Sequence, residues 1–318
     1  MQVNLILTRR LVLRACKEIT GTSPLSIDGF LVVDKAGGIT SHDVVAIARR
    51  ALGTRKVGHA GTLDPMATGV LVLGFGNGTR LLQYITDGEK SYEATVVLGA
   101  STVTDDAEGE ILETATLTEL AGISDEMIID SFKPMKGVIF QRPSSVSAVK
   151  VAGERAYARV RAGEKVDLPA REVTISILDV KQIRRVEGRI EIDICVTCGA
   201  GTFIRAIARD CGETLKVGGH LSKLRRTWVA PFDLSSAVSV TDLKSGEFNS
   251  LSVESVARLR FPVREISETE RDELRFGRAL SPAGTTVVTA AIFKEKLVAL
   301  LQDRDLKSCP IAVFSVES

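Results

Sequence analysis

Residues 58–69 read Gly58-His59-Ala60-Gly61-Thr62-Leu63-Asp64-Pro65-Met66-Ala67-Thr68-Gly69, which puts one histidine, one carboxylate, three glycines and a proline into a short run. Glycine lets the backbone reach positive φ or approach a ligand closely. Pro65 holds the residue before it in an extended conformation. The run therefore predicts a shaped loop that presents His59 and Asp64. The alternative is a helix start with Asp64 as N-cap and Pro65 at the first helical position, and residue chemistry alone favours it.

Size and composition bound the answer around this run. The chain has 318 residues, of which 44% are hydrophobic and 25% charged, and this is the composition of an ordinary globular protein with one large and one small domain. No run approaches the ~18 apolar residues that a membrane crossing needs. Arginines interrupt the apolar residues near the N-terminus, so residues 1–28 are expected to be an extension of unknown order. A soluble cytoplasmic protein follows.

The five cysteines form no recognisable framework, which favours reduced thiols. Cys195 and Cys198 have C-x-x-C spacing, but the alternating residues before them predict a strand. Residues i and i+3 of a strand point to opposite faces, so the two thiols would not converge on one ion. With only three scattered histidines, no metal site is expected.

Charge is distributed unevenly along the chain. Nine acidic residues and no Lys or Arg lie between 101 and 132, so the rest of the chain carries 41 basic residues against 31 acidic ones. Basic residues gather at Lys216, Lys223, Arg225 and Arg226. Local patches set the field that a phosphate backbone meets, so nucleic-acid binding stays open despite a net charge of +1. The alternative for any single lysine is a solvated helix face.

Hydrophobic periodicity predicts an α+β fold with a mixed, largely antiparallel sheet flanked by helices. Strands are expected at 29–35, 70–75, 91–98, 172–184 and 189–198, with short ones around 136–151. Helices are expected from a Thr40 cap to Leu52, at 78–87, near 117–132, at 154–162, from a Thr202 cap to Leu215, and at 221–226. Residues 29–232 would form the main domain, 233–260 a linker, and 261–318 a small β-rich domain.

Other patterns narrow the chemistry. The glycines at 74, 76 and 78 follow a strand but fail the G-x-G-x-x-G spacing, which disfavours a nicotinamide enzyme. Arg205 is placed in the first turn of a helix, where the helix dipole calls for an anionic partner such as Asp64. A guanidinium there would keep a nucleophilic carboxylate ionised. Tyr92 on a strand is either core or a ring that stacks on a base.

In this order the motifs resemble those of the TruB family of tRNA pseudouridine synthases. The matching residues are Leu31–Lys35 with Gly38, the 58–69 loop, Lys90–Tyr92, Ser147–Lys150 with Gly153 and Tyr157, Gly201–Arg205, and His220–Arg226. The resemblance implies the pseudouridine synthase fold over 29–232 and a PUA-like RNA-binding domain at 261–318, expected to grip the acceptor side of tRNA. It implies conversion of uridine 55 in the tRNA T loop to pseudouridine, without cofactor or metal. A monomer is expected separately.

The resemblance also assigns roles. Asp64 would be the nucleophile, paired with Arg205, and Tyr92 would stack on the base and serve in proton transfer. His59 would support the flipped-out nucleotide, because the target base must leave its stack. The remaining assignments are substrate binding by Phe203, Leu224 and Lys35, and RNA binding by Lys150, Lys223, Arg225 and Arg226.

Two departures from the family pattern concern fine contacts. Phe203 stands where many members have tyrosine, and Val146 precedes Ser147-Ala148 where many have tyrosine. Competing interpretations are a catalytically silent tRNA-binding protein or tRNA-folding chaperone, and an N-glycosidase that uses Asp64. A lone carboxylate argues against the glycosidase, since hydrolysis of glycosidic bonds normally uses a pair. Release of free uracil would distinguish it.

Overall fold

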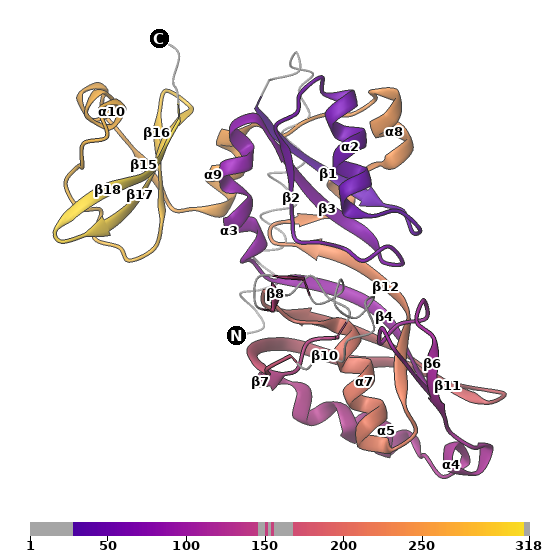
Figure 1. Ribbon diagram of the computed structural model, residues 1–318. Coiled ribbons are helices and arrows are strands. Elements are labelled where there is room, and N and C mark those ends of the chain that lie inside the picture. Colours follow the sequence, from indigo (N-terminus) through magenta and orange to yellow (C-terminus); the bar gives the residue numbers. More distant parts are fainter. Residues whose placement is uncertain (1–27, 146–149, 152–153, 156–167, 315–318) are drawn as a thin grey trace.

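A computed structural model describes residues 28–145, 150–151, 154–155 and 168–314. It contains one large mixed sheet flanked by helices and, beside it, a separate four-stranded sheet near the C-terminus (Figure 1). The predicted α+β class and the mixed, largely antiparallel sheet are confirmed. Within the described residues, no helix combines the length and apolar character that crossing a membrane requires.

The large sheet has ten strands in the order β14-β1-β3-β12-β4-β11-β10-β7, with β2 beside β3 and β13 beside β12. Their bounds are β1 Gly29–Lys35, β2 Val57–Ala60, β3 Thr68–Phe75, β4 Lys90–Leu98, β7 Gly137–Gln141, β10 Arg171–Val186, β11 Arg189–Cys198, β12 Gly219–Val229, β13 Phe232–Asp233 and β14 Val238–Ser239. Two small hairpins are β5 Ala100–Thr102 with β6 Ile111–Thr114, and β8 Lys150–Val151 with β9 Glu154–Arg155.

Helices cover both faces of this sheet (Figure 1). The α-helices are α2 Ser41–Ala51, α3 Leu82–Thr86, α4 Leu117–Ala121, α5 Asp125–Phe132, α7 Ile204–Leu215, α8 Val240–Ser245, α9 Val253–Arg260 and α10 Glu268–Arg275, with 3₁₀ turns at Gly76–Leu81, Lys133–Met135 and Leu234–Ser236. The predicted helix at 78–87 is therefore a 3₁₀ turn followed by α3, and the one near 117–132 is two short helices, α4 and α5.

Strand β12 corrects the predicted helix at 221–226. It lies in the middle of the sheet, antiparallel to β4 and parallel to β3. Leu221 and Leu224 are both buried, a spacing that would also place them on one face of a helix. The pairing with β4 shifts register between Leu221 and Lys223, and such a bulge changes which face later residues occupy. The bulge thus lets a strand bury both leucines.

The two helices that matter for the site begin differently. Thr40 caps α2 in a capping box with Asp43, as predicted, and the helix ends at Ala51. Helix α7 begins at Ile204 with Phe203 as N-cap and no side-chain cap. The prediction that Thr202 caps it is wrong, because the Thr202 hydroxyl donates to the Gly199 carbonyl instead. The predicted helix at 154–162 begins in strand β9, and its residues from 156 lie outside the described ones.

The segment 233–260, predicted as a linker, is folded. Strand β14 pairs in parallel with β1, and α8 packs beside α2. Helix α9 buries Val256 in the same core as Phe30 of β1. The Ser-rich, weakly patterned sequence predicts a linker, but α8 packs against α2 and β1, and α9 packs against β1, β16 and β17, elements that lie elsewhere in the chain.

The C-terminal sheet has the order β15-β16-β17-β18. Its strands are β15 Val263–Glu265, β16 Thr289–Phe293, β17 Lys296–Arg304 and β18 Lys307–Val313, with α10 against β17 and β18. The predicted β-rich C-terminal module is confirmed; the PUA-like assignment and the domain boundaries stay predictions. One core runs from this sheet through α9 and α3 to β1 and β3.

Strands β1 and β3 are buried on both faces. Leu71 and Leu73 face a core formed with α2 and α7, whereas Val70 and Val72 face the core shared with α9 and the C-terminal sheet. A strand covered on both sides reads as a continuous apolar run, and this explains residues 70–73. The loop between β2 and β3 therefore starts and ends on a rigid support.

Candidate active site

Asp64 lies in the loop that joins β2 to β3. The Ala67 amide donates to the Asp64 carbonyl at 3.1 Å, which closes a turn, and no helix follows Pro65. The helix-start alternative for Asp64 and Pro65 is therefore wrong. His59 lies within strand β2 rather than in the loop.

Three side chains hold the backbone on both sides of Asp64. Arg226 Nη2 donates to the Gly61 carbonyl at 3.0 Å, and Lys35 Nζ donates to the Pro65 carbonyl at 3.2 Å. The Ser41 hydroxyl donates to the Leu63 carbonyl at 3.0 Å and accepts from the Leu63 amide at 2.9 Å. Every second residue of the loop is thus anchored, so the Asp64 side chain is presented from a fixed backbone.

The Asp64 carboxylate meets Arg205. Arg205 Nε lies 3.0 Å from Asp64 Oδ2, with 6% of the arginine side chain and 36% of the aspartate side chain exposed. The predicted pairing of Arg205 with Asp64 is confirmed. A buried guanidinium thus holds the Asp64 carboxylate, which solvent or a ligand can still reach.

Arg205 also contacts a second carboxylate, which sequence reasoning missed. Arg205 Nη1 lies 3.3 Å from Asp106 Oδ2 and donates to the Thr104 carbonyl at 2.6 Å. Asp106 is buried, and its other oxygen accepts from Thr104 Oγ1 at 2.5 Å and from the Glu108 amide at 3.1 Å. The acidic stretch was interpreted through its charge alone; the signal was the pair of adjacent acids in a threonine-rich turn.

Tyr92 and Arg226 face one another across β4 and β12. Tyr92 is 9% exposed, and burial raises the pKa of its phenol above the ordinary value, while Arg226 opposes that shift by charge and hydrogen bonding. The phenol therefore keeps its proton at neutral pH. A protonated hydroxyl beside a guanidinium can donate a hydrogen bond toward the carboxylate loop.

Arg226 does not fit its predicted RNA-binding role. It is 1% exposed, with Nε donating to the Val70 carbonyl at 2.7 Å. A guanidinium inside the sheet cannot reach a phosphate at the surface, and its function is to hold the loop. Arg225 is half-buried and forms a bidentate ion pair with Asp34. Its Nη1 and Nη2 donate to Oδ1 and Oδ2 at 3.0 and 2.7 Å. Lys223 is exposed, and the side chain of Lys150 lies outside the described residues.

Burial tunes the cations around the loop. Lys35 is fully buried and donates to the Ala36 and Ile39 carbonyls as well as to Pro65, and burial lowers its pKa to about 8. Lys90 is likewise buried, with its pKa lowered to about 8 by desolvation. His59 stacks edge-on against His42, with ring centroids 5.5 Å apart, and burial lowers its pKa. His59 is therefore neutral at pH 7.

Phe203 and Leu224 are placed by neighbouring strands. The Gln141 side chain accepts from the Phe203 amide at 2.8 Å and donates to its carbonyl at 3.0 Å, which holds the start of α7. Leu224 is opposite Ala94, two residues from the Arg226–Tyr92 pair, and therefore on the same face. Leu224 thus lies on the face of the sheet that carries Tyr92 and Arg226, and Phe203 is held at the start of α7, two residues before Arg205.

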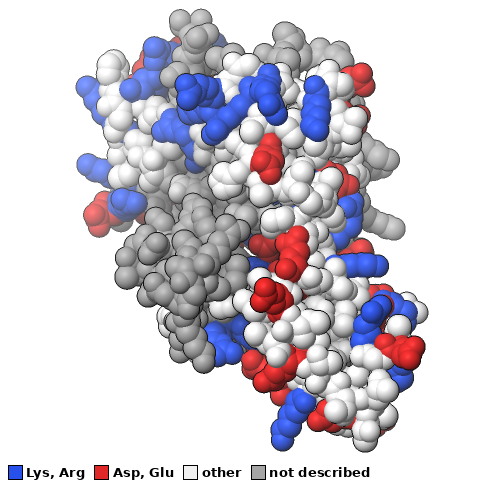
Figure 2. Space-filling model, turned by 45° about the vertical axis from the view of Figure 1, so that its right-hand side comes forward, with Lys and Arg blue, Asp and Glu red and all other residues white. Residues whose placement is uncertain are grey.

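Two further features bear on what the site could bind: possible metal ligands and exposed basic residues. Among the described residues, no three His, Cys, Asp or Glu side chains lie close enough together to hold a metal ion. Arg49, Arg50, Arg55 and Lys56 are exposed at the end of α2 and in the loop that leads to β2. No described carboxylate pairs with Arg50, Arg55 or Lys56. Figure 2 shows basic side chains gathered at the top of one face and acidic ones below.

Comparison with known proteins identifies the family. Residues 49–204 match the TruB family pseudouridylate synthase N-terminal domain, residues 205–260 the tRNA pseudouridylate synthase B C-terminal domain, and residues 261–315 the tRNA pseudouridine synthase II C-terminal domain. The chain belongs to the TruB family. The tRNA pseudouridine synthase B of Corynebacterium diphtheriae is 48% identical over 91% of this chain and 97% of its own. That of Mycobacterium sp. (strain KMS) is 49% identical over 90% and 96%.

Solved structures support the fold of this TruB family member. A chain in the structure of an H/ACA RNP bound to a substrate RNA containing 2′-deoxyuridine superposes with a TM-score of 0.67 at 22% identity, covering 91% of this chain and 85% of that one. A chain of a Cbf5-Nop10-Gar1 complex superposes with a TM-score of 0.66 at 24% identity, covering 90% and 84%. The predicted pseudouridine synthase fold is therefore confirmed.

Proposed function

We propose that this protein isomerises uridine to pseudouridine in the T loop of tRNA, at position 55. The observation that carries the proposal is the ion pair between Asp64 and Arg205 at the exposed end of a loop with anchored carbonyls. The relatives that are 48–49% identical over nearly the whole chain are tRNA pseudouridine synthases B, which supports tRNA as the substrate.

The reaction needs one nucleophile and a base that can turn. Asp64 attacks ribose C1′ or uracil C6, the N1–C1′ bond breaks, and uracil rotates within the site. A bond then forms between C5 and C1′. The bond from Asp64 to C1′ or C6 breaks, which returns the free carboxylate, the proton on C5 leaves, and N1 gains a proton. Arg205 holds and orients the attacking carboxylate of Asp64 through their ion pair.

The remaining side chains are assigned to holding the base and the nucleotide. Tyr92 stacks on the base and, since it stays protonated, can deliver or relay a proton. Phe203 and Leu224 line the uracil, and neutral His59 supports the flipped-out conformation. Lys35 organises the loop through the Pro65 carbonyl.

The RNA-binding surface is proposed to combine several parts. Lys150, Lys223 and Arg225 are kept from the sequence-based assignment, with Arg225 weakened by its pairing to Asp34. The exposed residues Arg50, Arg55 and Lys56 add positive charge that no described carboxylate neutralises. The C-terminal domain, as a PUA-like module, would contact the acceptor side. We further propose a cytoplasmic monomer that works without metal or cofactor.

The proposal is tested by tritium release from a T stem-loop labelled with [5-³H]uridine, comparing wild type with Asp64→Asn. Release by the wild type alone, without free uracil, is expected, with the tRNA affinity of the variant within a few-fold of wild type. Free uracil would indicate an N-glycosidase. Tight binding without release by either protein would indicate a silent tRNA-binding protein or chaperone. Turnover by the variant would remove Asp64 from its role.

A further inference from the structure

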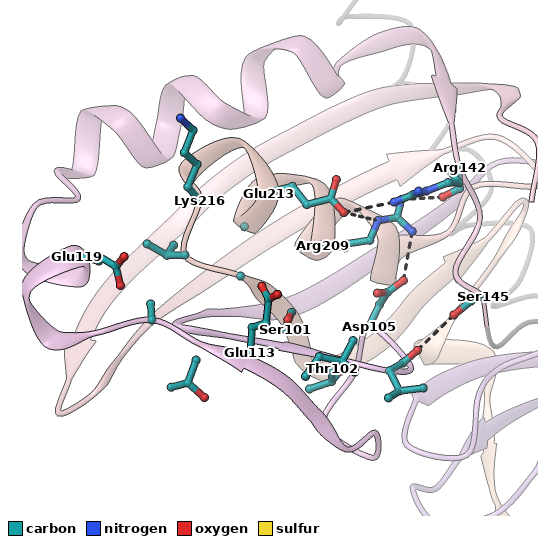
Figure 3. A pocket seen from close by; sticks show the side chains of 18 of the residues that line it. Ser101, Thr102, Asp105, Glu113, Glu119, Arg142, Ser145, Arg209, Glu213 and Lys216 are labelled. Carbon is teal, nitrogen blue, oxygen red and sulfur yellow. Dashed lines mark hydrogen bonds and ion pairs between the residues drawn. The ribbon is translucent and has the colours of Figure 1, made fainter. Parts of the chain in front are cut away.

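An open pocket of about 1000 Å³ lies beside the helix α7 that carries Arg205. The β5–β6 hairpin, residues 142–145 and the end of α7 line it (Figure 3). Asp105 and Arg209 stand in its wall, and a dashed line in Figure 3 joins them. Asp64 is not among the lining residues, but Asp105 directly precedes Asp106, the buried partner of Arg205.

Arg205 and Arg209 are four residues apart on α7 and therefore lie on one face of the helix. Each forms an ion pair with one of two consecutive aspartates. Arg209 Nη1 lies 3.3 Å from Asp105 Oδ2, just as Arg205 Nη1 lies 3.3 Å from Asp106 Oδ2. The Arg209 and Asp105 side chains are 12% and 11% exposed, so this is a largely buried ion pair.

An unusual backbone makes this double grip possible. Asp105 has φ 58°, in the left-handed region that aspartate tolerates better than most residues. In extended chain, consecutive side chains point to opposite sides. The left-handed residue instead lets both carboxylates meet the same helix, and such local strain is typical of functional sites.

Without Arg209, Asp105 would be a buried carboxylate that has lost its ion-pair partner. Burial is the largest effect on Asp105 and raises its pKa, while the charge of Arg209 and, to a smaller extent, that of Arg205 lower it. Arg209 pairs with Asp105 through Nη1, while its Nη2 donates to the Arg142 carbonyl at 2.8 Å and contacts Asp210 at 2.6 Å. The guanidinium is thus fixed on three sides.

We infer that Arg209 is a positioning residue of the catalytic site. By pairing with Asp105, it keeps Arg205 bound to Asp106 and Asp64 in the geometry that the reaction needs. This inference rests on the proposed function. It makes a specific demand, namely that the damage from losing Arg209 comes from the charge of Asp105. Removing that charge should then repair the damage.

The test measures single-turnover pseudouridine formation at saturating tRNA, together with tRNA affinity and thermal unfolding, for four variants. Arg209→Gln is expected to slow the reaction at least tenfold with tRNA affinity within twofold of wild type. Arg209→Gln combined with Asp105→Asn is expected to recover most of that loss, and Arg209→Lys, which keeps the charge, to stay within threefold of wild type. Arg142→Gln is the matched control, since its side chain pairs with Glu213 and is half exposed.

The outcomes separate the inference from the proposed function. An inactive wild type would overturn the function and the inference together. With an active wild type, a double variant as slow as Arg209→Gln, or an Arg209→Gln rate within twofold of wild type, would overturn the inference alone, because the uncompensated charge of Asp105 would then not be what slows the reaction. If Arg209→Gln does not fold, the Arg209→Lys and double variants decide, and slow turnover by either rejects the inference.

Discussion

Arg226 and Gly69 are paired in register where β12 meets β3, and no side chain fits between them. Gly69 has φ 102°, and a Cβ there would lie 2.1 Å from the Arg226 carbonyl oxygen. This contact joins the two halves of the large sheet, because β12 is the strand that connects β3 to β4. The arginine side chain at the same point reaches back to the Gly61 carbonyl, so the seam of the sheet and the Asp64 loop share one anchor.

Replacing Gly69 with alanine should therefore destabilise the protein strongly. Both the positive φ and the clash with backbone act against any side chain, and we expect a loss of about 3 kcal/mol or more. Gly53→Ala is the control, since Gly53 also has positive φ (64°) but open space around its Cβ position. It should cost about 1 kcal/mol. Urea unfolding of both variants measures the difference; equal losses would contradict the close approach.

Replacing Arg226 with methionine should impair both stability and turnover. The change leaves the Gly61 and Val70 carbonyls without their donor and Tyr92 without its neighbour, for a loss of about 3 kcal/mol. Arg225→Met removes a half-exposed ion pair worth about 1 kcal/mol or less. Thermal unfolding and tritium release should rank the two variants in that order. The reverse ranking would return Arg226 to an RNA-binding role.

The buried Lys35 makes stability depend on pH. Its pKa is about 8 in the folded protein and ~10.4 in the unfolded chain. Between these values the unfolded state binds more protons, so this residue's contribution to the free energy of unfolding rises with pH. Below pH 8 the burial penalty of the charged amine is fully present. The difference in unfolding free energy between wild type and Lys35→Met should therefore shift in favour of wild type from pH 8 to pH 10.

Urea unfolding of the two proteins at several pH values across that range provides the measurement. The comparison with the variant removes the contributions of other groups that titrate there, such as Cys198, whose pKa burial raises to about 11. A constant difference would contradict the prediction, because it would mean that the pKa of Lys35 is the same in the folded and unfolded states.

The basic residues before β2 should contribute to tRNA affinity through phosphate contacts. Replacing Arg50, Arg55 and Lys56 by alanine should weaken binding and reduce the salt dependence of log K by about 2, at ~0.7–0.9 per phosphate contact. Replacing Lys223 and Arg225 should reduce it less, because Arg225 is already paired with Asp34. Filter binding of tRNA at several salt concentrations measures both slopes. An unchanged slope in the triple variant would leave those residues as a solvated surface.

Local patterns determined much of this protein. The Thr40–Asp43 capping box, the alternation along 189–198 and the apolar run at 70–73 specify their elements through contacts within a few residues. The 58–69 run likewise identified Asp64, because glycine and proline there restrict the backbone directly. The position of Arg205 in a predicted first helical turn was enough to suggest an anionic partner such as Asp64, because the helix dipole there disfavours an unpaired cation.

Tertiary structure decided what depends on residues far apart in the chain. Nothing local shows that Arg226 is buried while its neighbour Arg225 reaches the surface; that follows from the place of β12 between β3 and β4. The same bulged strand was read as a helix, because a shift of register is set by the partner strand. The roles of Asp106 and Arg209 also depend on tertiary structure. Their ion pairs, with Arg205 and Asp105, form only because α7 packs against the 104–106 turn.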